Sequence, residues 1–350
     1  MLKRHGGDVL SLTFFVALPE VKKRLMLLHP KGPHRVSGRI KAVPRTNHYS
    51  LVGTAFDYLL RWNVRRRAPR AVDEKWVAEH GVIHLNLACT ALQRMQYGDD
   101  PSSVSISPDE KAVATIMGMG CPPVDVWYEA WLRLKAAKAA VEKGASDREL
   151  AVHALRMAKL DVIYRCGTVV PDLLDPPDDE DVADLLAMLD LVPFERLLDG
   201  GKPVLLNPTF GELSDLMGGA DADLIAGDML VEFKTTKKAN ISGRHMSQLL
   251  GYYLLARKCR DRGLKPFPEI RRVGVYFSRY GELWTMKTEV WTSREEFGEV
   301  EEWFFRRAEE LGRPVEKLEE RRRRAEELRQ RVEKLRAAVE RRGLRRPRDV

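Results

Sequence analysis

The spacing of apolar residues divides the chain near residue 200. Before it, apolar positions recur three or four residues apart, as in helices that bury one face. The pattern predicts helices over residues 20–28, 51–66, 72–97, 108–118, 123–143, 146–165 and 180–190. The stretch 31–48 carries two prolines and two glycines among charged residues, which indicates an exposed loop.

Beyond residue 200 the pattern becomes that of short strands separated by turns. It predicts strands over residues 204–210, 220–225, 229–235, 272–278 and 283–288. A helix over 243–260 stands between the third and fourth strands, with Leu249, Leu250, Tyr253 and Leu254 on its apolar face. The order is therefore βββαββ, and an α/β (α+β) fold is expected.

The last part of the chain, residues 293–342, predicts one or two long charged helices. Within it the apolar positions 318, 325, 328, 332, 335 and 339 are spaced 7, 3, 4, 3 and 4 residues apart. This is an a/d seam of about three heptads, typical of a short coiled coil. A helical hairpin, a modest homodimer or another protein partner is the expectation for this end.

Basic residues are concentrated at the start of the chain. Residues 1–70 hold 15 lysines and arginines against three acidic residues, a balance of 15 − 3 = +12, while the whole chain has +8. Phosphate backbones attract such a segment, so Arg65, Arg66 and Arg67 are candidate DNA contacts. A solvated basic surface without a ligand is the alternative.

Cysteines and apolar runs limit other classes of protein. The four cysteines lie far apart with no CxxC pair, so zinc and iron–sulfur sites have no support. Scattered thiols suit a reducing cytosol, and a cytoplasmic location is expected. The apolar run Val9 to Leu18, about ten residues, is too short to span a bilayer. We therefore expect no membrane span and no signal peptide.

The segment 218–236 carries the candidate chemistry. Alternate side chains of a strand share a face, so Glu232 and Lys234 are expected to point the same way. A two-residue turn at Gly227-Asp228 suits a type II′ hairpin, because glycine stands first. That turn pairs residues whose numbers sum to 455, which places Asp223 directly opposite Glu232.

Two facing acidic residues with Cβ atoms about 5 Å apart repel each other, and a divalent cation offsets the repulsion. Mg²⁺ prefers carboxylate oxygens, so the pair predicts a site for Mg²⁺ or Mn²⁺. The backbone carbonyl of Phe233 is a further candidate ligand, and Asp221 is an alternative to Asp223. Lys234 would lie beside a metal-activated water, where it orients the water or stabilises charge developing on a phosphate.

The order of elements, with Asp…Glu-x-Lys on the second and third strands, resembles the PD-(D/E)XK nuclease superfamily. The following helix adds Gln248-Leu-Leu-Gly-Tyr252, similar to the QxxxY motif of RecB-like nucleases and of the CRISPR adaptation nucleases. Residues four apart share one face of a helix, so both side chains can reach the same cleft. The resemblance covers residues 200–290, about a quarter of the chain.

The resemblance implies a restriction-endonuclease-like core with a mixed sheet, acting as a metal-dependent deoxyribonuclease that hydrolyses phosphodiester bonds. It implies that Asp223 and Glu232 bind the metal and that Lys234 and Gln248 complete the catalytic set. Gln248 and Tyr252 would contact the substrate or the catalytic lysine. DNA repair, phage recombination and defence all use this fold. An inactive nucleic-acid-binding or scaffold protein on the same fold is the alternative, and a partner protein acting through its terminal helices is a third.

Three further features bear on the resemblance. Gly53–Tyr58 resembles the glycine-led helix of RecB-like nucleases, with Asp57 where that family often has a histidine. This departure argues against a histidine-assisted metal site, and a plain buried helix is the alternative. Arg244 and His245 open the helix after the active strand, as phosphate contacts or as an ordinary exposed pair. The CRISPR relatives hold an iron–sulfur cluster with three cysteines near the C-terminus. No cysteine follows Cys259 here, so no cluster is expected.

These patterns predict four parts. Residues 1–70 form a basic segment and the first core helix, and residues 71–199 form a mostly helical region or insertion. Residues 200–292 form the nuclease core, and residues 293–350 form the charged terminal helices.

Overall fold

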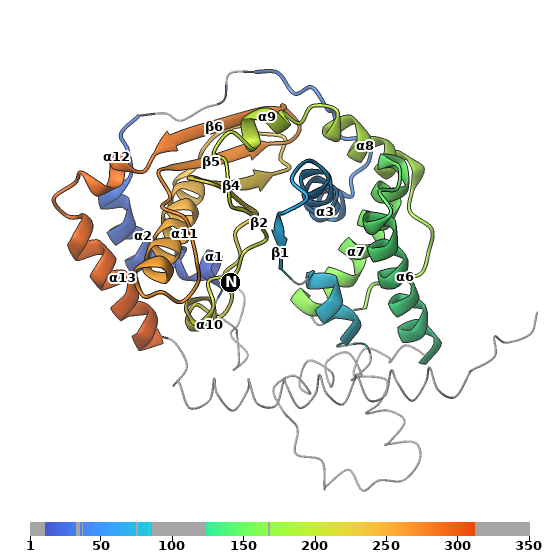
Figure 1. The fold of residues 1–350 in the computed structure, drawn as a ribbon, viewed down its shortest axis with the longest axis horizontal. Helices are drawn as coiled ribbons and strands as arrows, with labels where there is room; N and C mark the ends of the chain where they lie inside the picture. The colour runs from blue at the N-terminus through green and yellow to red at the C-terminus, as the bar shows by residue number, and fades with distance from the viewer. Residues whose placement is uncertain are drawn as a thin grey trace, which may run out of the picture.

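A computed structural model gives the fold of this chain (Figure 1). It describes residues 11–311 apart from 33–35, 37, 75, 84, 86–123, 167 and 168.

A six-stranded mixed sheet forms the centre of the molecule, and its strands lie side by side in chain order, β1 to β6. The pairs β1–β2 and β4–β5 are parallel, and the other three pairs are antiparallel. The strands are β1 (Val72–Asp73), β2 (Val204–Leu206), β3 (Leu224–Ala226), β4 (Met229–Lys234), β5 (Arg272–Phe277) and β6 (Glu282–Lys287). The fold class is therefore mixed α and β, as expected.

Helices cover both faces of this sheet (Figure 1). One layer contains α1 (Leu12–Phe15), α2 (Pro19–Leu25), the 3₁₀ turn η1 (Met26–Leu28), α10 (Glu212–Leu216), α11 (Gly243–Asp261), α12 (Glu289–Thr292) and α13 (Phe297–Leu311). The other contains α3 (Tyr49–Arg67), α6 (Val124–Glu142), α7 (Asp147–Cys166), α8 (Asp179–Leu189) and α9 (Phe194–Leu197).

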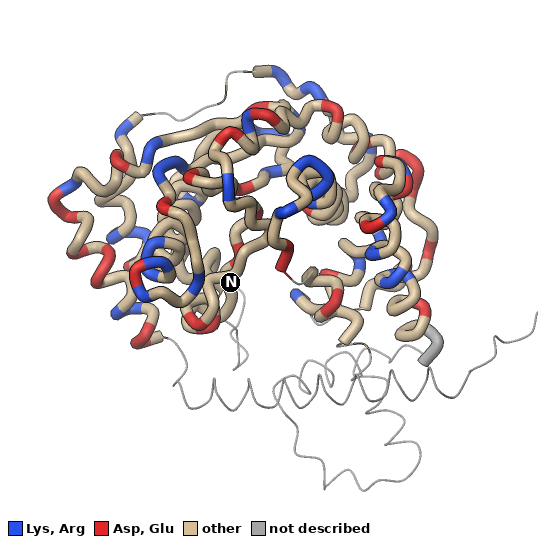
Figure 2. Tube along the Cα trace, viewed as in Figure 1, with Lys and Arg blue, Asp and Glu red and all other residues tan. Residues whose placement is uncertain are grey.

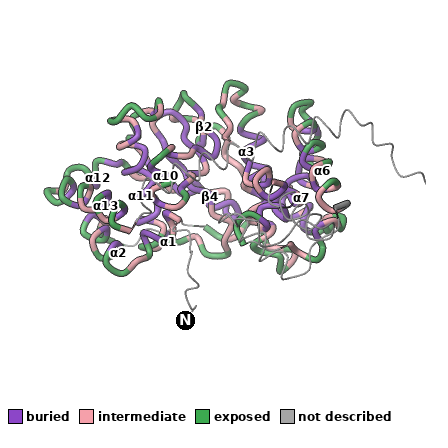
Figure 3. Tube along the Cα trace, turned by 90° about the horizontal axis from the view of Figure 1, so that it is seen from below, coloured by how far each residue is buried: buried purple, intermediate pink, exposed green. Residues whose placement is uncertain are grey.

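The two layers bury two separate hydrophobic clusters, one on each face of the sheet. Alternate residues of β4 divide between them: Met229, Val231 and Phe233 pack toward α3, and Leu230 packs toward α11. The buried residues follow the sheet, α3 and α11 through the middle of the molecule (Figure 3). Helices α6, α7, α8 and α9 share one cluster with α3 and the sheet, so the helical region packs directly on the core.

A buried ion pair also joins α8 to the sheet. Arg279, which follows β5, donates hydrogen bonds of 2.8 and 2.9 Å to the two carboxylate oxygens of Asp184 in α8. A third bond, of 3.2 Å, reaches the carbonyl of Ala42. The side chains of Arg279 and Asp184 are only 2% and 1% exposed, so each charge depends on the other.

Two predicted elements are wrong in their details. Val72 and Asp73, expected to begin a helix, form β1 beside β2, because strand pairing overrides a weak helical spacing. Within the helix expected over 72–97, helical backbone begins only at residue 77. The expected strand over 204–210 ends at Leu206, since Asn207 takes a positive φ of 49° and Pro208 follows.

The expected run of three consecutive strands is also interrupted. Helix α10 lies between β2 and β3, and β3 begins at Leu224 rather than at residue 220. Gly211 and Gly218, with φ of 58° and 72°, bracket this short helix. The expected helix over 108–118 and the heptad seam over 318–339 lie outside the described residues.

The other predicted elements agree with the structure within a few residues. Helices α3, α6, α7, α8 and α11 and strands β4, β5 and β6 all appear where the pattern places them. None of the described helices is long and apolar enough to cross a membrane.

Many cations of the amino-terminal segment form ion pairs within the molecule. The pairs are Arg24–Glu299, Lys41–Glu282, Arg45–Glu180, Arg65–Asp73 and Arg66–Asp147. Basic and acidic residues alternate over both helical layers (Figure 2). The excess of +12 in residues 1–70 is therefore met in part by acidic residues from later in the chain.

Candidate active site

A pocket of about 330 Å³ lies where the β3–β4 hairpin meets α1, α3, α7 and α11. Its charged lining consists of Asp57, Asp161, Asp221, Asp223, Glu232, Arg61, Arg165 and Lys234. Gln248 and Tyr252 line it from α11. The residues of the Asp…Glu-x-Lys and QxxxY patterns are thus brought to one place.

The hairpin register explains how Asp223 and Glu232 meet. Strand pairs join Leu224 to Val231 and Ala226 to Met229, numbers that sum to 455 as predicted. Asp223 stands one step before β3, so the same register places it opposite Glu232. Gly227 has a φ of 54° and Asp228 has no positive φ, which fits a type II′ turn.

Glu232 is buried, with 6% of its surface exposed. Its Oε1 accepts hydrogen bonds from Lys234 Nζ at 2.6 Å and from Gln248 Nε2 at 2.9 Å. Its Oε2 is buried and has no hydrogen-bond partner among the described residues. A buried carboxylate oxygen without a partner is unfavourable, so this atom needs a cation or a donor that enters the pocket.

Asp223 and Asp57 are held in an environment that disfavours their charge. Burial, followed by the nearby Glu232 carboxylate, raises the pKa of Asp223 well above its usual value, although Phe233 N donates to its Oδ2 at 2.6 Å. Burial also raises the pKa of Asp57 to about 7, with Arg61 opposing the change and Glu232 adding to it. The carboxylates of Asp57, Asp223 and Glu232 therefore repel one another within the pocket.

The pocket carboxylates also change the pKa values of Lys234 and Tyr252. Burial lowers the pKa of Lys234, but the Glu232 and Asp223 carboxylates more than offset this, so its net pKa is raised. Burial, followed by Glu232, raises the pKa of Tyr252. Lys234 therefore stays an ammonium and Tyr252 stays a phenol at neutral pH.

The donor set fits a hard divalent cation. Oxygen ligands are those that Mg²⁺ prefers, and a cation would relieve the repulsion among Asp57, Asp223 and Glu232. The carboxylate oxygens of these three residues do not all lie within 4.8 Å of one another in the structure. A cation there would therefore draw the carboxylates closer together.

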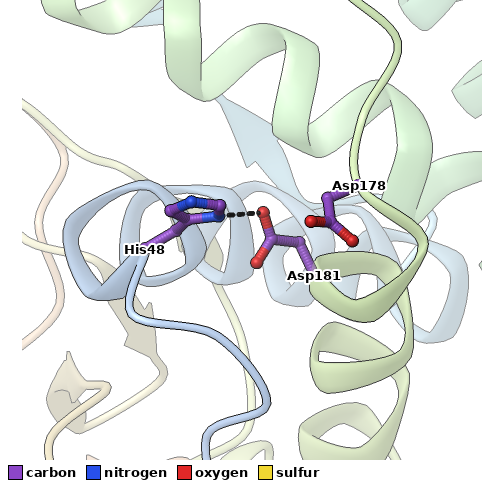
Figure 4. Close-up of side chains that lie close together, drawn as sticks. All are labelled: His48, Asp178 and Asp181. Carbon is purple, nitrogen blue, oxygen red and sulfur yellow. Dashed lines mark hydrogen bonds and ion pairs between the residues drawn. The ribbon is translucent and has the colours of Figure 1, made fainter.

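A second group does meet that spacing, just before the start of α3. It consists of His48, Asp178 and Asp181, beside a separate pocket (Figure 4). Asp181 accepts from Thr46 Oγ1 at 2.5 Å and lies 2.8 Å from His48 Nδ1, and Asp178 caps α8 by accepting from Glu180 N at 2.8 Å. The hydrogen bond to the Asp181 carboxylate raises the pKa of His48.

The group can hold a metal ion. The same hydrogen bonds also give it a structural role, because they connect α8 to the loop before α3.

The structure places the arginines predicted to contact DNA outside the pocket lining. Arg65 pairs with Asp73 at 3.6 Å and Arg66 with Asp147 at 2.6 Å. Arg67 donates to Asn63, and its guanidinium lies 3.6 Å from the centre of the Phe194 ring. All three therefore have partners within the protein, and their contact with DNA stays a prediction.

Arg244 and His245 lie at the start of α11. Arg244 is exposed, whereas His245 forms a capping box with Ser242 through bonds of 3.2 and 3.3 Å. Burial, followed by Lys234, lowers the pKa of His245. Phe233 lines the pocket beside Glu232, and ligation by its carbonyl stays a prediction.

Asp221, the alternative to Asp223, also lines the pocket and pairs with Thr209 in an isolated bridge. The register favours Asp223, because Asp223 is the residue opposite Glu232. Cys166 is exposed, Cys259 is buried and the other two cysteines lie outside the described residues. The absence of an iron–sulfur cluster stays a prediction.

Sequence reasoning missed the helical wall of the pocket. Asp57 and Arg61 stand four residues apart on α3, so their shared face was visible in the predicted helix 51–66. Asp161 and Arg165 have the same spacing on α7. Nothing in the local pattern brings α7 to the hairpin, and only the packing of α7 on α3 does so.

Comparison of the chain with protein-family models, with curated proteins and with solved structures finds no match.

The raised pKa of Asp57 predicts a pH-dependent stability in the metal-free protein. Between the ordinary value of 3.8 and about 7, the folded state binds this proton more tightly than the unfolded state does. Its contribution is therefore full below pH 4 and is lost as the pH rises toward 7. A shift of this size corresponds to at most roughly 4 kcal/mol, and water in the pocket reduces it.

Asp57→Asn is accordingly expected to be more stable than the wild type at pH 7.5 in chelator, with the difference vanishing near pH 3. Urea unfolding at both pH values measures this. Equal stabilities at pH 7.5 would show that Asp57 is well solvated.

Proposed function

We propose that this protein is a metal-dependent nuclease of the PD-(D/E)XK type, which hydrolyses phosphodiester bonds of DNA with Mg²⁺ or Mn²⁺. The observation that carries the proposal is the pocket itself. Asp223, Glu232 and Lys234 converge there with Gln248, and one buried oxygen of Glu232 has no partner among the described residues. The mixed sheet, covered on both faces by helices, supports a restriction-endonuclease-like core.

The carboxylates of Asp223 and Glu232, with Asp57 across the pocket, would hold the cation. A divalent cation supplies positive charge against a phosphate and makes water a better nucleophile. Asp57 stands where RecB-like nucleases often have a histidine, so all three side-chain ligands would be carboxylates.

The remaining residues have separate tasks. Lys234, an ammonium held 2.6 Å from Glu232, donates a hydrogen bond rather than accepting a proton, and it stabilises charge that develops on the phosphate. Gln248 fixes the Glu232 carboxylate through its bond of 2.9 Å. Gln248 also donates to the Tyr252 hydroxyl at 3.2 Å, and Tyr252 stacks on Phe210, which holds this end of α11 in place.

The alternative is a nucleic-acid-binding or scaffold protein that kept the fold without activity. An inactive descendant has no requirement for a buried acidic pair facing a lysine, because such a pair is costly in the absence of a cation. The buried Asp223 and Glu232 carboxylates beside Lys234 therefore favour the enzyme.

The proposal is tested by incubating the protein with labelled single-stranded DNA, double-stranded DNA and RNA, each with Mg²⁺, Mn²⁺ or chelator. We expect cleavage of DNA that needs the cation and is lost in Glu232→Gln. Glu142→Gln, at an exposed position at the end of α6, is the matched control and should cut normally. Cleavage in excess chelator, or normal cleavage by Glu232→Gln, would refute the proposal.

A further inference from the structure

A buried arginine faces the carboxylates from the helical side of the pocket. Arg61 follows Asp57 by one helical turn on α3, lines the pocket and has 5% of its surface exposed. Its Nε donates to the Asp57 carbonyl at 3.2 Å, and its guanidinium lies 4.6 Å from the centre of the Tyr58 ring. Its Nη1 is buried and has no hydrogen-bond partner among the described residues.

A second arginine stands beside it on another helix. Arg165, in the last turn of α7, also lines the pocket, and 54% of its side chain is exposed. Its Nε lies 3.5 Å from Asp161 Oδ2, a long contact. Asp161 Oδ1 accepts from the Tyr58 hydroxyl at 2.6 Å, so Asp161 is already held by a stronger bond.

These contacts leave donors of the two guanidinium groups available to a ligand. A buried guanidinium N–H without an acceptor is unfavourable, and a ligand oxygen entering the pocket would satisfy it. The planar fork of arginine matches the oxygens of a phosphate, which accepts two N–H bonds at once. The pocket therefore has a carboxylate end suited to a cation and an arginine end suited to an anion.

We propose that Arg61 and Arg165 bind a phosphate group of the nucleic-acid strand that enters this pocket, next to the bond that is cut. The inference rests on the proposed function for the identity of this ligand. It assigns the helical region between β1 and β2 a direct part in substrate binding, through α7. The competing explanation is structural: Arg61 could serve only as the counter-charge to Asp57, Asp73 and Asp161, which surround it.

Binding can be measured apart from cleavage. Fluorescence anisotropy with a labelled single-stranded oligonucleotide, in Ca²⁺ in place of Mg²⁺, reports affinity and its dependence on salt. Arg165→Gln is the first variant, because this half-exposed side chain can be changed without opening the core. Arg61→Lys is the second, because it keeps the positive charge between the acidic residues and removes only the fork.

We expect each variant to bind the oligonucleotide at least 10-fold more weakly than the wild type. The slope of log affinity against log salt should fall by about 0.7 in Arg165→Gln, which loses one phosphate contact on a single strand. Arg148→Gln, an exposed arginine at the other end of α7, is the matched control and should change neither quantity. Thermal unfolding of each variant verifies that it is folded.

The source of the phosphate is distinguished by two oligonucleotides of the same sequence, one with a 5′-phosphate and one with a 5′-hydroxyl. Equal weakening for both supports an internal phosphodiester, and weakening confined to the phosphorylated strand supports a terminal phosphate. Folded Arg165→Gln and Arg61→Lys proteins that bind both strands as the wild type does would overturn the inference.

The two proposals fail in different ways. A wild-type protein that cuts DNA while both arginine variants bind it normally would refute the phosphate site and leave the nuclease intact. A wild-type protein that never cuts, yet binds strands through Arg165, would refute the nuclease and leave the phosphate site standing.

Discussion

Lys234→Ala is expected to reduce cleavage by at least roughly 10²–10³-fold while cation binding stays close to that of the wild type. The reason is a division of labour between neighbouring groups. Carboxylate oxygens hold a hard cation, whereas the Lys234 ammonium, 2.6 Å from Glu232, can only donate to it or to a phosphate. Cleavage rates in Mg²⁺ and calorimetric titration with Mg²⁺ measure the two properties separately.

The carboxylate variants should behave differently. Asp223→Asn and Glu232→Gln are expected to lose cation binding and cleavage together, and to raise the stability of the metal-free protein slightly by removing repulsion. Lys234→Ala should lower that stability, because it removes the ammonium that pairs with the Glu232 carboxylate. Lys238→Ala, at an exposed position just beyond β4, is the control. Normal cleavage by Lys234→Ala would contradict the assigned role.

Asp184→Ala is expected to destabilise the fold by about 3–5 kcal/mol, the largest effect on stability that we predict. It leaves the Arg279 guanidinium, 2% exposed, without the carboxylate that accepts two of its hydrogen bonds. Urea unfolding followed by circular dichroism measures the change. Replacing both partners with apolar residues of similar size should recover most of the loss, since no charge then remains buried.

The same helix supplies the comparison for this pair. Asp179 in α8 pairs with Arg148, and their side chains are 87% and 61% exposed. Asp179→Ala should therefore cost under about 1 kcal/mol. If Asp184→Ala costs no more than Asp179→Ala does, burial does not give the Arg279 pair the weight that we assign to it.

The centre of the candidate site could be predicted from sequence because its geometry is local. A two-residue turn fixes the register of a hairpin, and the alternation of a strand fixes which side chains share a face. These two rules place Asp223, Glu232 and Lys234 with no knowledge of the rest of the fold. Helical spacing then places Gln248 and Tyr252 on one face of the next helix.

The rest depends on contacts between distant parts of the chain. Strand β1 has only two residues, and it exists because residues about 130 positions later pair with it. Arg66 and Arg24 meet acidic partners 81 and 275 positions away, so a local excess of charge gave no guide to where these side chains point. Arg61 and Arg165 likewise come together in the pocket only when α7 packs on α3.

The walls of the pocket have a consequence for the synthesis of this chain. Their residues run from Ser11 in the first described segment to Tyr252 in α11. A growing polypeptide holds Asp57 and Arg61 long before it holds Glu232, Lys234 or the helix that fixes them. No early intermediate on the ribosome carries the complete pocket, so whatever chemistry the pocket performs begins only after α11 has emerged and docked.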